Sequence, residues 1–425
     1  MYEVKTYPSG MRLIVEHMQN YESVSFNMFI QTGSINEDTT NRGISHFIEH
    51  MLFKGTKNRS AVEIVTRLDA IGASVNAFTS KKETVYYTKS TKESLHECVD
   101  ILSDMYFNST FEEKEIKREK KVVTEEIAMY NDNAAAVADE LSSRAFYEGT
   151  PMQYDIAGSK TSVRNLDRAK IDKYMAERYL PQNLILSFAG NITIEEAKKF
   201  AETHFESKFT TKAEPIIIKT PEVLTIPKTK YVKQFKDNEQ AQIVITFPAI
   251  NAHDPRYYEL SLFNAIWGSG MSSRLFQTIR EKLGLVYSVY SSSESSNFGG
   301  TLSIYLGTTV KNIKVAVTAL KKAIDTIVED GVMQQELIDA KTNLINSLKL
   351  RYENTAYVSL YHAKMLSLFN YSFKKEDVIS ALEAKTKEQI DSLITDIYGK
   401  NNYVISMVGK DTKTDLLKCF QTAKS

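Results

Sequence analysis

The sequence has only two cysteines among its 425 residues, and it has no apolar run long enough to cross a bilayer. Cys98 and Cys419 stand alone without a CxxC spacing, so neither a disulfide framework nor a cysteine metal site is predicted. A membrane span needs about 18 to 20 consecutive apolar residues, so no membrane association is expected. The first residues also lack the pattern of a secretory signal. These absences predict a reduced, cytoplasmic protein.

The sequence also lacks an excess of either charge. Lys and Arg total 53, Asp and Glu total 53, and the formal net charge is +0. A balanced chain has no global field to attract nucleic acid or an anionic membrane surface, so we expect neither as a partner. The length exceeds one ordinary hydrophobic core, which predicts two or more domains.

Proline is scarce too, and three of the eight prolines lie within the segment TTKAEPIIIKTPEVLTIPKTK: Pro215, Pro221 and Pro227. This segment cannot run as a helix, and it predicts an extended linker over residues 211–229. The linker separates residues 1–210 from residues 230–425. Each part has the size of a typical domain.

The two parts resemble each other near their ends, in YLPQNLILSFAGNITIEEAKKF and YGKNNYVISMVGKDTKTDLLKCF. Both segments read as a short apolar strand, a glycine turn and an amphipathic helix. A constant offset of 219 residues relates four positions in each: Tyr179, Asn183, Ser187 and Gly190 match Tyr398, Asn402, Ser406 and Gly409. This similarity predicts an internal duplication.

Periodicity predicts both strands and helices in each part. Alternation in SVSFNMFIQTG puts Val24, Phe26, Met28 and Ile30 on one face of a strand, and AQIVITFPA and GGTLSIYLGTT read similarly. The clearer helices are expected over residues 42–54, 61–72, 92–107, 111–130, 255–267, 309–329 and 333–352. Strict βαβ alternation is missing. We therefore predict an α+β fold of two homologous domains, each a mostly antiparallel sheet packed with helices.

The segment GISHFIEHMLFKG carries the strongest signal for chemistry. On a helix His46 and His50 lie about 40° apart, with Glu49 on the same side. Two imidazoles on adjacent turns can hold a tetrahedral zinc ion, whose bound water becomes a nucleophile when Glu49 accepts its proton. The order H-x-x-E-H is the inverzincin signature.

Purely structural explanations also exist for this motif. A single histidine on an apolar helix face is usually a hydrogen-bonded core residue. The full pattern, however, is expected by chance only roughly 0.008 times in such a chain. Axial haem ligation is a third interpretation that the spacing disfavours, because residues at i and i+4 cannot occupy opposite sides of one haem.

A third zinc ligand is expected from TFEEKEIKREKKVVTEEIAMYND, residues 110–132. Glu119 and Glu126 stack two turns apart on the apolar face of the predicted helix. A buried carboxylate needs a partner, and a metal with its histidines provides one. A solvated acidic residue remains the alternative when this helix is considered alone.

These motifs together resemble the pitrilysin/insulinase zinc metallopeptidases, most of all the bacterial relatives of the mitochondrial processing peptidase β subunit. The resemblance spans the chain and includes TGSINED, GASVNAFTSKKETVYY and GSGMSSRLFQTIREKLGLVYSVYS. It implies one Zn²⁺ per chain held by His46, His50 and Glu126. It makes Glu49 the general base and Glu119 an acid that supports a ligand.

The resemblance also assigns residues to the substrate. The strand formed by Asn76, Ala77, Phe78 and Thr79 would take a peptide as an added strand. Arg280 and Tyr287 match a pair that stabilises the developing oxyanion. In this family the pair comes from the half that faces the zinc half across a closed chamber, which implies a homodimer in which Arg280 and Tyr287 act in trans.

Two hypotheses of different classes follow. The first is a zinc endopeptidase that hydrolyses peptides or unfolded segments. The second is a non-catalytic scaffold or assembly subunit of the same fold, although such relatives have usually lost motif residues that this chain keeps. The physiological substrate and the choice between processing and degradation are not predicted.

Overall fold

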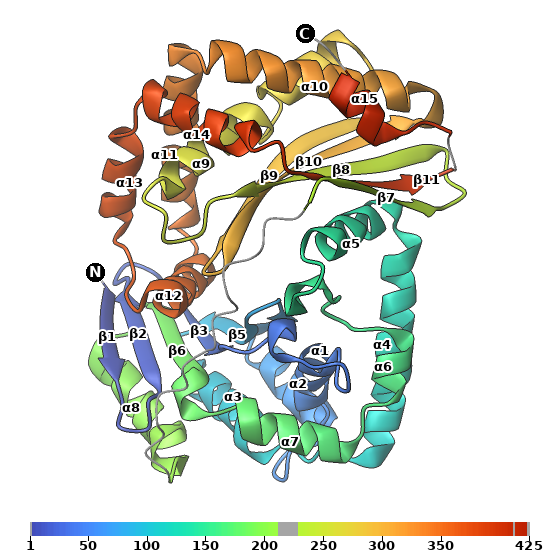
Figure 1. Cartoon of the computed structure of the whole chain (residues 1–425). Coiled ribbons are helices and arrows are strands. Elements are labelled where there is room, and N and C mark those ends of the chain that lie inside the picture. Colours follow the sequence, from blue (N-terminus) through green and yellow to red (C-terminus); the bar gives the residue numbers. More distant parts are fainter. Residues whose placement is uncertain (1, 211–227, 411–412, 423–425) are drawn as a thin grey trace. The chain divides into compact units, whose positions relative to one another are not determined.

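The structure, a computed structural model, describes residues 2–210, 228–410 and 413–422. These residues form two compact units, whose elements are labelled in Figure 1. Unit 1 takes its described residues from Met1–Ala128, Tyr154–Ile218 and Lys349–Lys374, and unit 2 from Met129–Gln153, Lys219–Leu348 and Lys375–Ser425. Each unit therefore includes one segment from the other half of the sequence. Most of the expected linker, residues 211–227, lies outside the described residues.

Unit 1 is built on a six-stranded sheet in the order β1-β2-β6-β3-β5-β4. The strands are β1 (Tyr2–Thr6), β2 (Arg12–His17), β3 (Ser23–Ile30), β4 (Ser74–Thr79), β5 (Thr84–Thr91) and β6 (Leu184–Gly190). Every neighbouring pair is antiparallel except β2 with β6. The mostly antiparallel sheet that the sequence predicts is confirmed.

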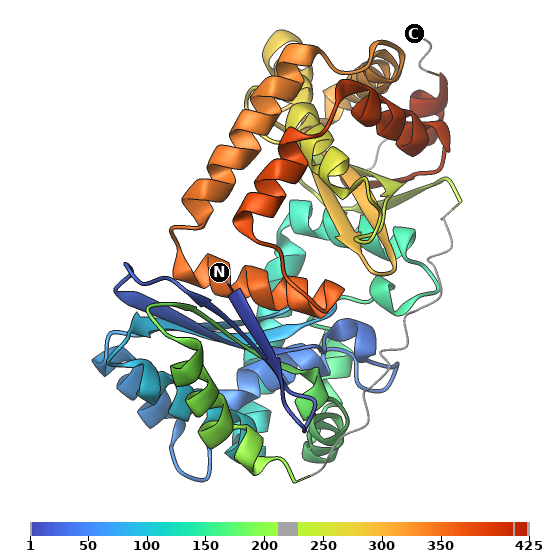
Figure 2. The same cartoon turned by 90° about the vertical axis from the view of Figure 1, so that its left-hand side faces the viewer.

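Helices cover both faces of this sheet. On one face the large core contains residues of α1 (Ile44–Leu52), α2 (Ala61–Ala70), α3 (Leu95–Asn108), α4 (Glu113–Asp132), α6 (Lys160–Arg164), α7 (Arg168–Arg178) and α8 (Ile194–His204). The predicted β3 face, from Val24 to Ile30, lies in this core. Phe29 points to the other face, which α12 (Thr355–Phe369) covers (Figure 2). The sheet is therefore buried on two sides, which a period-two pattern alone does not reveal.

Unit 2 repeats the plan with a five-stranded sheet in the order β7-β11-β8-β10-β9. Its strands are β7 (Lys230–Phe235), β8 (Gln240–Ala249), β9 (Ser288–Ser296), β10 (Gly299–Thr309) and β11 (Val404–Gly409). Its α-helices are α5 (Ala134–Phe146), α9 (Tyr257–Trp267), α10 (Ile313–Asp330), α11 (Gln334–Arg351), α13 (Lys375–Glu383), α14 (Lys387–Gly399) and α15 (Leu416–Thr422). A π-helix covers Phe276–Lys282. The last residues of α11, from Lys349, belong to unit 1. Only β7 and β11 are parallel neighbours, as β2 and β6 are in unit 1.

The duplication extends to matching hydrogen bonds. Ser187 on β6 donates to the carbonyl of Ser359 on α12 at 2.7 Å. Its partner in the repeat, Ser406 on β11, donates to the carbonyl of Ala138 on α5 at 2.9 Å. In each unit an inner strand of the sheet thus binds a helix that comes from the other half of the sequence. No helix among the described residues is long and apolar enough to cross a membrane.

Candidate metal centre

Helix α1 presents His46, Glu49 and His50 on one half-buried face. Its opposite face enters the core through Phe47, Ile48 and other apolar residues, which fixes the rotation of the helix. The two imidazole rings lie 4.6 Å apart between centroids, with 67° between their planes. The burial pattern therefore explains why two polar rings occur in an apolar segment.

The start of α1 is held by a buried carboxylate. Glu37 accepts hydrogen bonds from the backbone N–H of Gly43 at 2.7 Å and of Ser45 at 2.9 Å. Burial raises the pKa of Glu37 to about 7, although these bonds oppose the shift. Gly43 has φ +85°, and a Cβ there would lie 2.5 Å from the carbonyl oxygen of Ala157. Only glycine fits this junction, and the helix starts at a fixed place.

Helix α4 brings Glu126 to the two histidines. One carboxylate oxygen, Oε2, lies 3.4 Å from His50 Nε2 and 3.8 Å from His46 Nε2. This oxygen is buried and has no hydrogen-bond partner among the described residues. Two ligand atoms on one tetrahedral zinc ion lie about 3.4 Å apart, given metal–ligand distances near 2.0–2.1 Å. The donor set therefore fits Zn²⁺.

These three residues form the one group of three possible metal ligands that converges in the described ranges, with ligand atoms within 4.8 Å of one another. Glu125, the next residue on α4, is exposed, as its position about 100° around the helix predicts. Burial, with the neighbouring His50, lowers the pKa of His46 to about 4. His46 is therefore neutral near pH 7, the state in which an imidazole binds a metal.

Glu119, two turns before Glu126 on α4, supports this centre. Its side chain is 2% exposed, and its Oε1 lies 2.9 Å from His50 Nδ1. Lys54 Nζ lies 2.8 Å from the other oxygen, Oε2. Burial alone would raise the pKa of Glu119, but the bonds to His50 and Lys54 hold it below its ordinary value. Because an ionised carboxylate can only accept, Nδ1 of His50 donates to it and Nε2 stays free for a metal.

Glu49 is held by the edge strand of the sheet. The hydroxyl of Thr79 on β4 donates to Glu49 Oε2 at 2.5 Å. Burial raises the pKa of Glu49, while Thr79 and His50 oppose the shift. A base whose pKa lies closer to the working pH transfers protons more effectively. Strand β4, with Asn76, Ala77 and Phe78 before Thr79, pairs with β5 on one side and forms the edge of the sheet.

Arg280 and Tyr287 belong to unit 2. Arg280 lies in the π-helix, is exposed, and has its guanidinium carbon 4.6 Å from the ring centre of Phe276. Tyr287 is 57% exposed, and its N–H donates to the carbonyl of Gly307 just before β9 begins. Strand β9 is the edge strand of its sheet, in the place that β4 has in unit 1. Their predicted role at the zinc centre stays a prediction.

Sequence reasoning missed three contributions to this centre. Lys54 follows His50 by four residues, so the same helical spacing that paired the histidines could have placed it on their side. Glu37 lies in the TGSINED segment, where no residue had been given a role. Nothing in the sequence indicates that the Thr79 hydroxyl meets Glu49, because this contact joins a strand to a helix.

The fold and the site define the class of protein: two duplicated α+β units, one of which carries an H-x-x-E-H helix with a distant glutamate. The family model described as Insulinase (Peptidase family M16) matches residues 12–160, and the Peptidase M16 inactive domain matches residues 165–344. The chain belongs to the M16 peptidase family.

Relatives and solved structures agree with this membership. The protein called Uncharacterized zinc protease YmxG of Bacillus subtilis is 35% identical over 403 residues, covering 95% of this chain and 97% of that protein. An Uncharacterized zinc protease of Rickettsia bellii is 32% identical over 90% of this chain and 91% of its own. The crystal structure titled peptidase M16 inactive domain from Pseudomonas fluorescens superposes with a TM-score of 0.89 over 97% of this chain and 99% of that chain; at 19% identity it shows the fold alone.

Proposed function

We propose that the protein is a zinc-dependent endopeptidase that hydrolyses peptides or unfolded segments. The observation that carries the proposal is the buried Glu126 oxygen, which has no hydrogen-bond partner in the described part of the chain and faces Nε2 of both His46 and His50. A bound Zn²⁺ supplies a Lewis acid that polarises a carbonyl and acidifies a water molecule. Only one centre of this kind is expected per chain, because the repeat offset of 219 puts Ile345 where Glu126 would be.

The residues around the ion then have separate tasks. Glu49 takes the proton of the attacking water and delivers it to the leaving amine. Thr79 orients that carboxylate, and Glu119 keeps His50 in the tautomer that leaves Nε2 free. The outer edge of β4 binds the peptide as an added strand, mainly through backbone hydrogen bonds. This mode of binding tolerates varied side chains, which suits a peptidase of broad specificity.

The oxyanion is stabilised by Arg280 and Tyr287 of a second copy in a homodimer that encloses the substrate. Support for this part is the resemblance and the exposure of both side chains on unit 2. A cytoplasmic location is proposed on the sequence alone, which lacks the pattern of a secretory signal and a disulfide framework. The alternative, a non-catalytic assembly subunit, has no observation in its favour, because the predicted ligands and base are all present.

The test of the activity compares four proteins on a quenched peptide: the native chain, Glu49→Gln, Glu126→Gln and Glu125→Gln. We expect Glu49→Gln to keep its zinc and lose activity by at least a thousandfold, in the range of lost base and nucleophile activation. Glu126→Gln should lose both zinc and activity. Glu125→Gln is the matched control on the exposed face and should change neither. Equal activity of the native and Glu49→Gln proteins would refute the assigned base.

A mixing experiment tests action in trans. Glu49→Gln and Arg280→Ala proteins are each inactive, and their subunits are exchanged after mixing. If the pair acts across a homodimer, half of the dimers are hybrids with one complete site, and activity returns to about a quarter of the native value. No recovery, with subunit exchange confirmed by mass, would show that the pair acts within one chain, and an Arg280→Ala protein that is active by itself would show that Arg280 has no role.

A further inference from the structure

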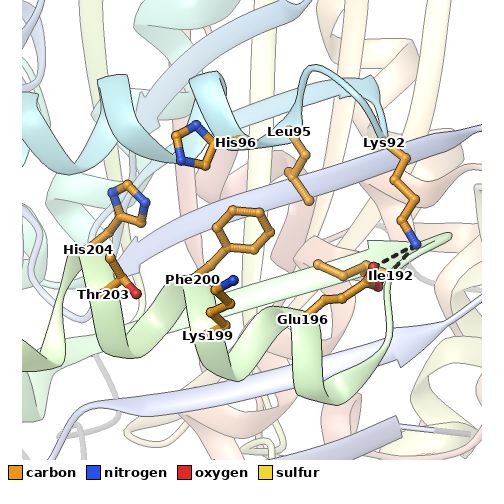
Figure 3. Close-up of a pocket in the computed structure, with 9 residues that line it drawn as sticks. All are labelled: Lys92, Leu95, His96, Ile192, Glu196, Lys199, Phe200, Thr203 and His204. Atoms are coloured by element: carbon orange, nitrogen blue, oxygen red, sulfur yellow. Dashed lines mark hydrogen bonds and ion pairs between the residues drawn. The ribbon is translucent and has the colours of Figure 1, made fainter.

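A cavity of about 330 Å³ lies in unit 1 between α3 and α8. Figure 3 shows the imidazoles of His96 and His204 near one end of it and the Lys92–Glu196 ion pair near the other, with Phe200 between them. None of these residues belongs to the centre formed by α1 and α4. The cavity is therefore separate from the peptidase site.

The two histidines lack hydrogen-bond partners in the part of the chain that the structure describes. His204 is 8% exposed, and its Nδ1 lies 3.6 Å from Asp100 Oδ1, beyond hydrogen-bond distance. His96 is exposed at the cavity rim. Both imidazoles line the cavity without a hydrogen-bond partner among the described residues, so their ring nitrogens are available to a ligand there.

The ring geometry indicates which ligand fits. The two ring centres are 5.4 Å apart, with 77° between their planes. Two imidazoles that bind one tetrahedral ion at about 2.0–2.1 Å place their ring centres about 5 Å apart. Asp100 also follows His96 by four residues on α3, on the same side of the helix.

We propose that His96 and His204 form a second metal site for a borderline divalent transition-metal ion such as Zn²⁺. Imidazole is a preferred ligand of such ions. The two imidazoles would hold the ion beside the cavity, and water or a small anion from the cavity would complete its coordination. Lys199, which lines the cavity and has no ionic partner among the described residues, favours an anion and weakens the hold on the cation. The site therefore binds zinc more weakly than the three-ligand centre.

The test is a zinc titration of the full-length chain, stripped of metal and followed by calorimetry and by direct metal analysis. We expect two zinc ions per chain, the second bound at least tenfold more weakly than the first. His96→Ala should remove the weaker ion and keep the tighter one. This variant suits the test because His96 is exposed and its loss does not disturb the core.

Two controls separate the sites. Thr203→Ala changes a cavity residue that has no ligand nitrogen, and it should still bind two ions. His46→Ala removes a ligand of the α1 centre and should keep the weaker ion, which makes the two sites independently testable. A native chain that binds one ion, or a His96→Ala variant that binds two, would overturn the proposal.

Discussion

Replacing Glu119 by glutamine tests the support of the metal centre without changing a proposed ligand. The native carboxylate, 2% exposed, accepts from His50 Nδ1 on one oxygen and contacts Lys54 Nζ with the other. Glutamine has the same size, but its amide offers one acceptor and two donors. Whichever way the amide turns, its nitrogen faces a donor, so one of the two bonds is lost.

We expect this loss to weaken zinc binding by roughly tenfold to a hundredfold, or about 1.4 to 2.7 kcal/mol, which is the range for partners of a metal-bound histidine. The negative charge of Glu119 also makes His50 more basic. Burial alone would lower the pKa of His50, but Glu119, with Glu126 and Glu49, raises it. The neutral amide removes the largest of these contributions.

The assay is competition for zinc between the protein and a chromophoric chelator at constant pH. Glu125→Gln makes the same chemical change on the exposed face of α4, and it should bind zinc like the native chain. Each variant is first shown to unfold at the native urea midpoint. If Glu119→Gln and Glu125→Gln bind zinc equally well, the reasoning about the His50 tautomer is refuted. Lys54→Gln should fall between the two, because Lys54 is 30% exposed and water replaces part of its interaction.

Three further predictions follow from buried polar contacts. Thr79→Val should lower kcat/KM by roughly tenfold to a hundredfold with zinc content unchanged. It should also move the acidic limb of the pH profile to higher pH, because the hydrogen bond from Thr79 holds the pKa of Glu49 down and its loss lets that pKa rise. An unmoved limb would contradict this. The pKa of Glu37 rises from 4.5 to about 7 on folding, so its contribution to stability is fullest below pH 4.5 and is lost as pH passes 7. Urea unfolding at pH 5 and pH 8 should show that the native chain loses about 2.5 kcal/mol more than Glu37→Gln. Equal losses in the two proteins would disprove this. Ser187→Ala and Ser406→Ala should each lower the free energy of unfolding by about 1 kcal/mol, and a large difference between them would argue against equivalent roles.

The sequence predicted the elements well where one strong pattern governs a long segment. The expected helix over 111–130 is α4 (Glu113–Asp132), and the one over 333–352 is α11 (Gln334–Arg351). The matching positions of Ser187 and Ser406 helped to predict the duplication. In the structure each of them binds a helix in the same structural place. Periodicity is a property of residues close together in the sequence, and internal similarity is found by comparing one part of the sequence with the other. Both can therefore be recognised without knowledge of the fold.

The helices that cover the second face of each sheet were not predicted. Helix α12 packs on the sheet of unit 1 and α5 on that of unit 2, although each comes from the other half of the sequence. Their docking depends on contacts between residues far apart in the chain. Dividing the chain at the linker therefore gives the two halves of the sequence, but these halves differ from the two compact units.

The sequence alone determined which helix carries the histidines and which residues could ligate, because i, i+4 spacing is a local property of a helix. Only the tertiary structure decided that Glu126 meets both imidazoles, that Lys54 and Glu119 hold His50, and that Thr79 holds Glu49. The physical reason is that these contacts join different elements. The distances in these contacts follow from the packing of α1, α4 and β4 around one core. This packing cannot be deduced from the spacing of residues along the chain.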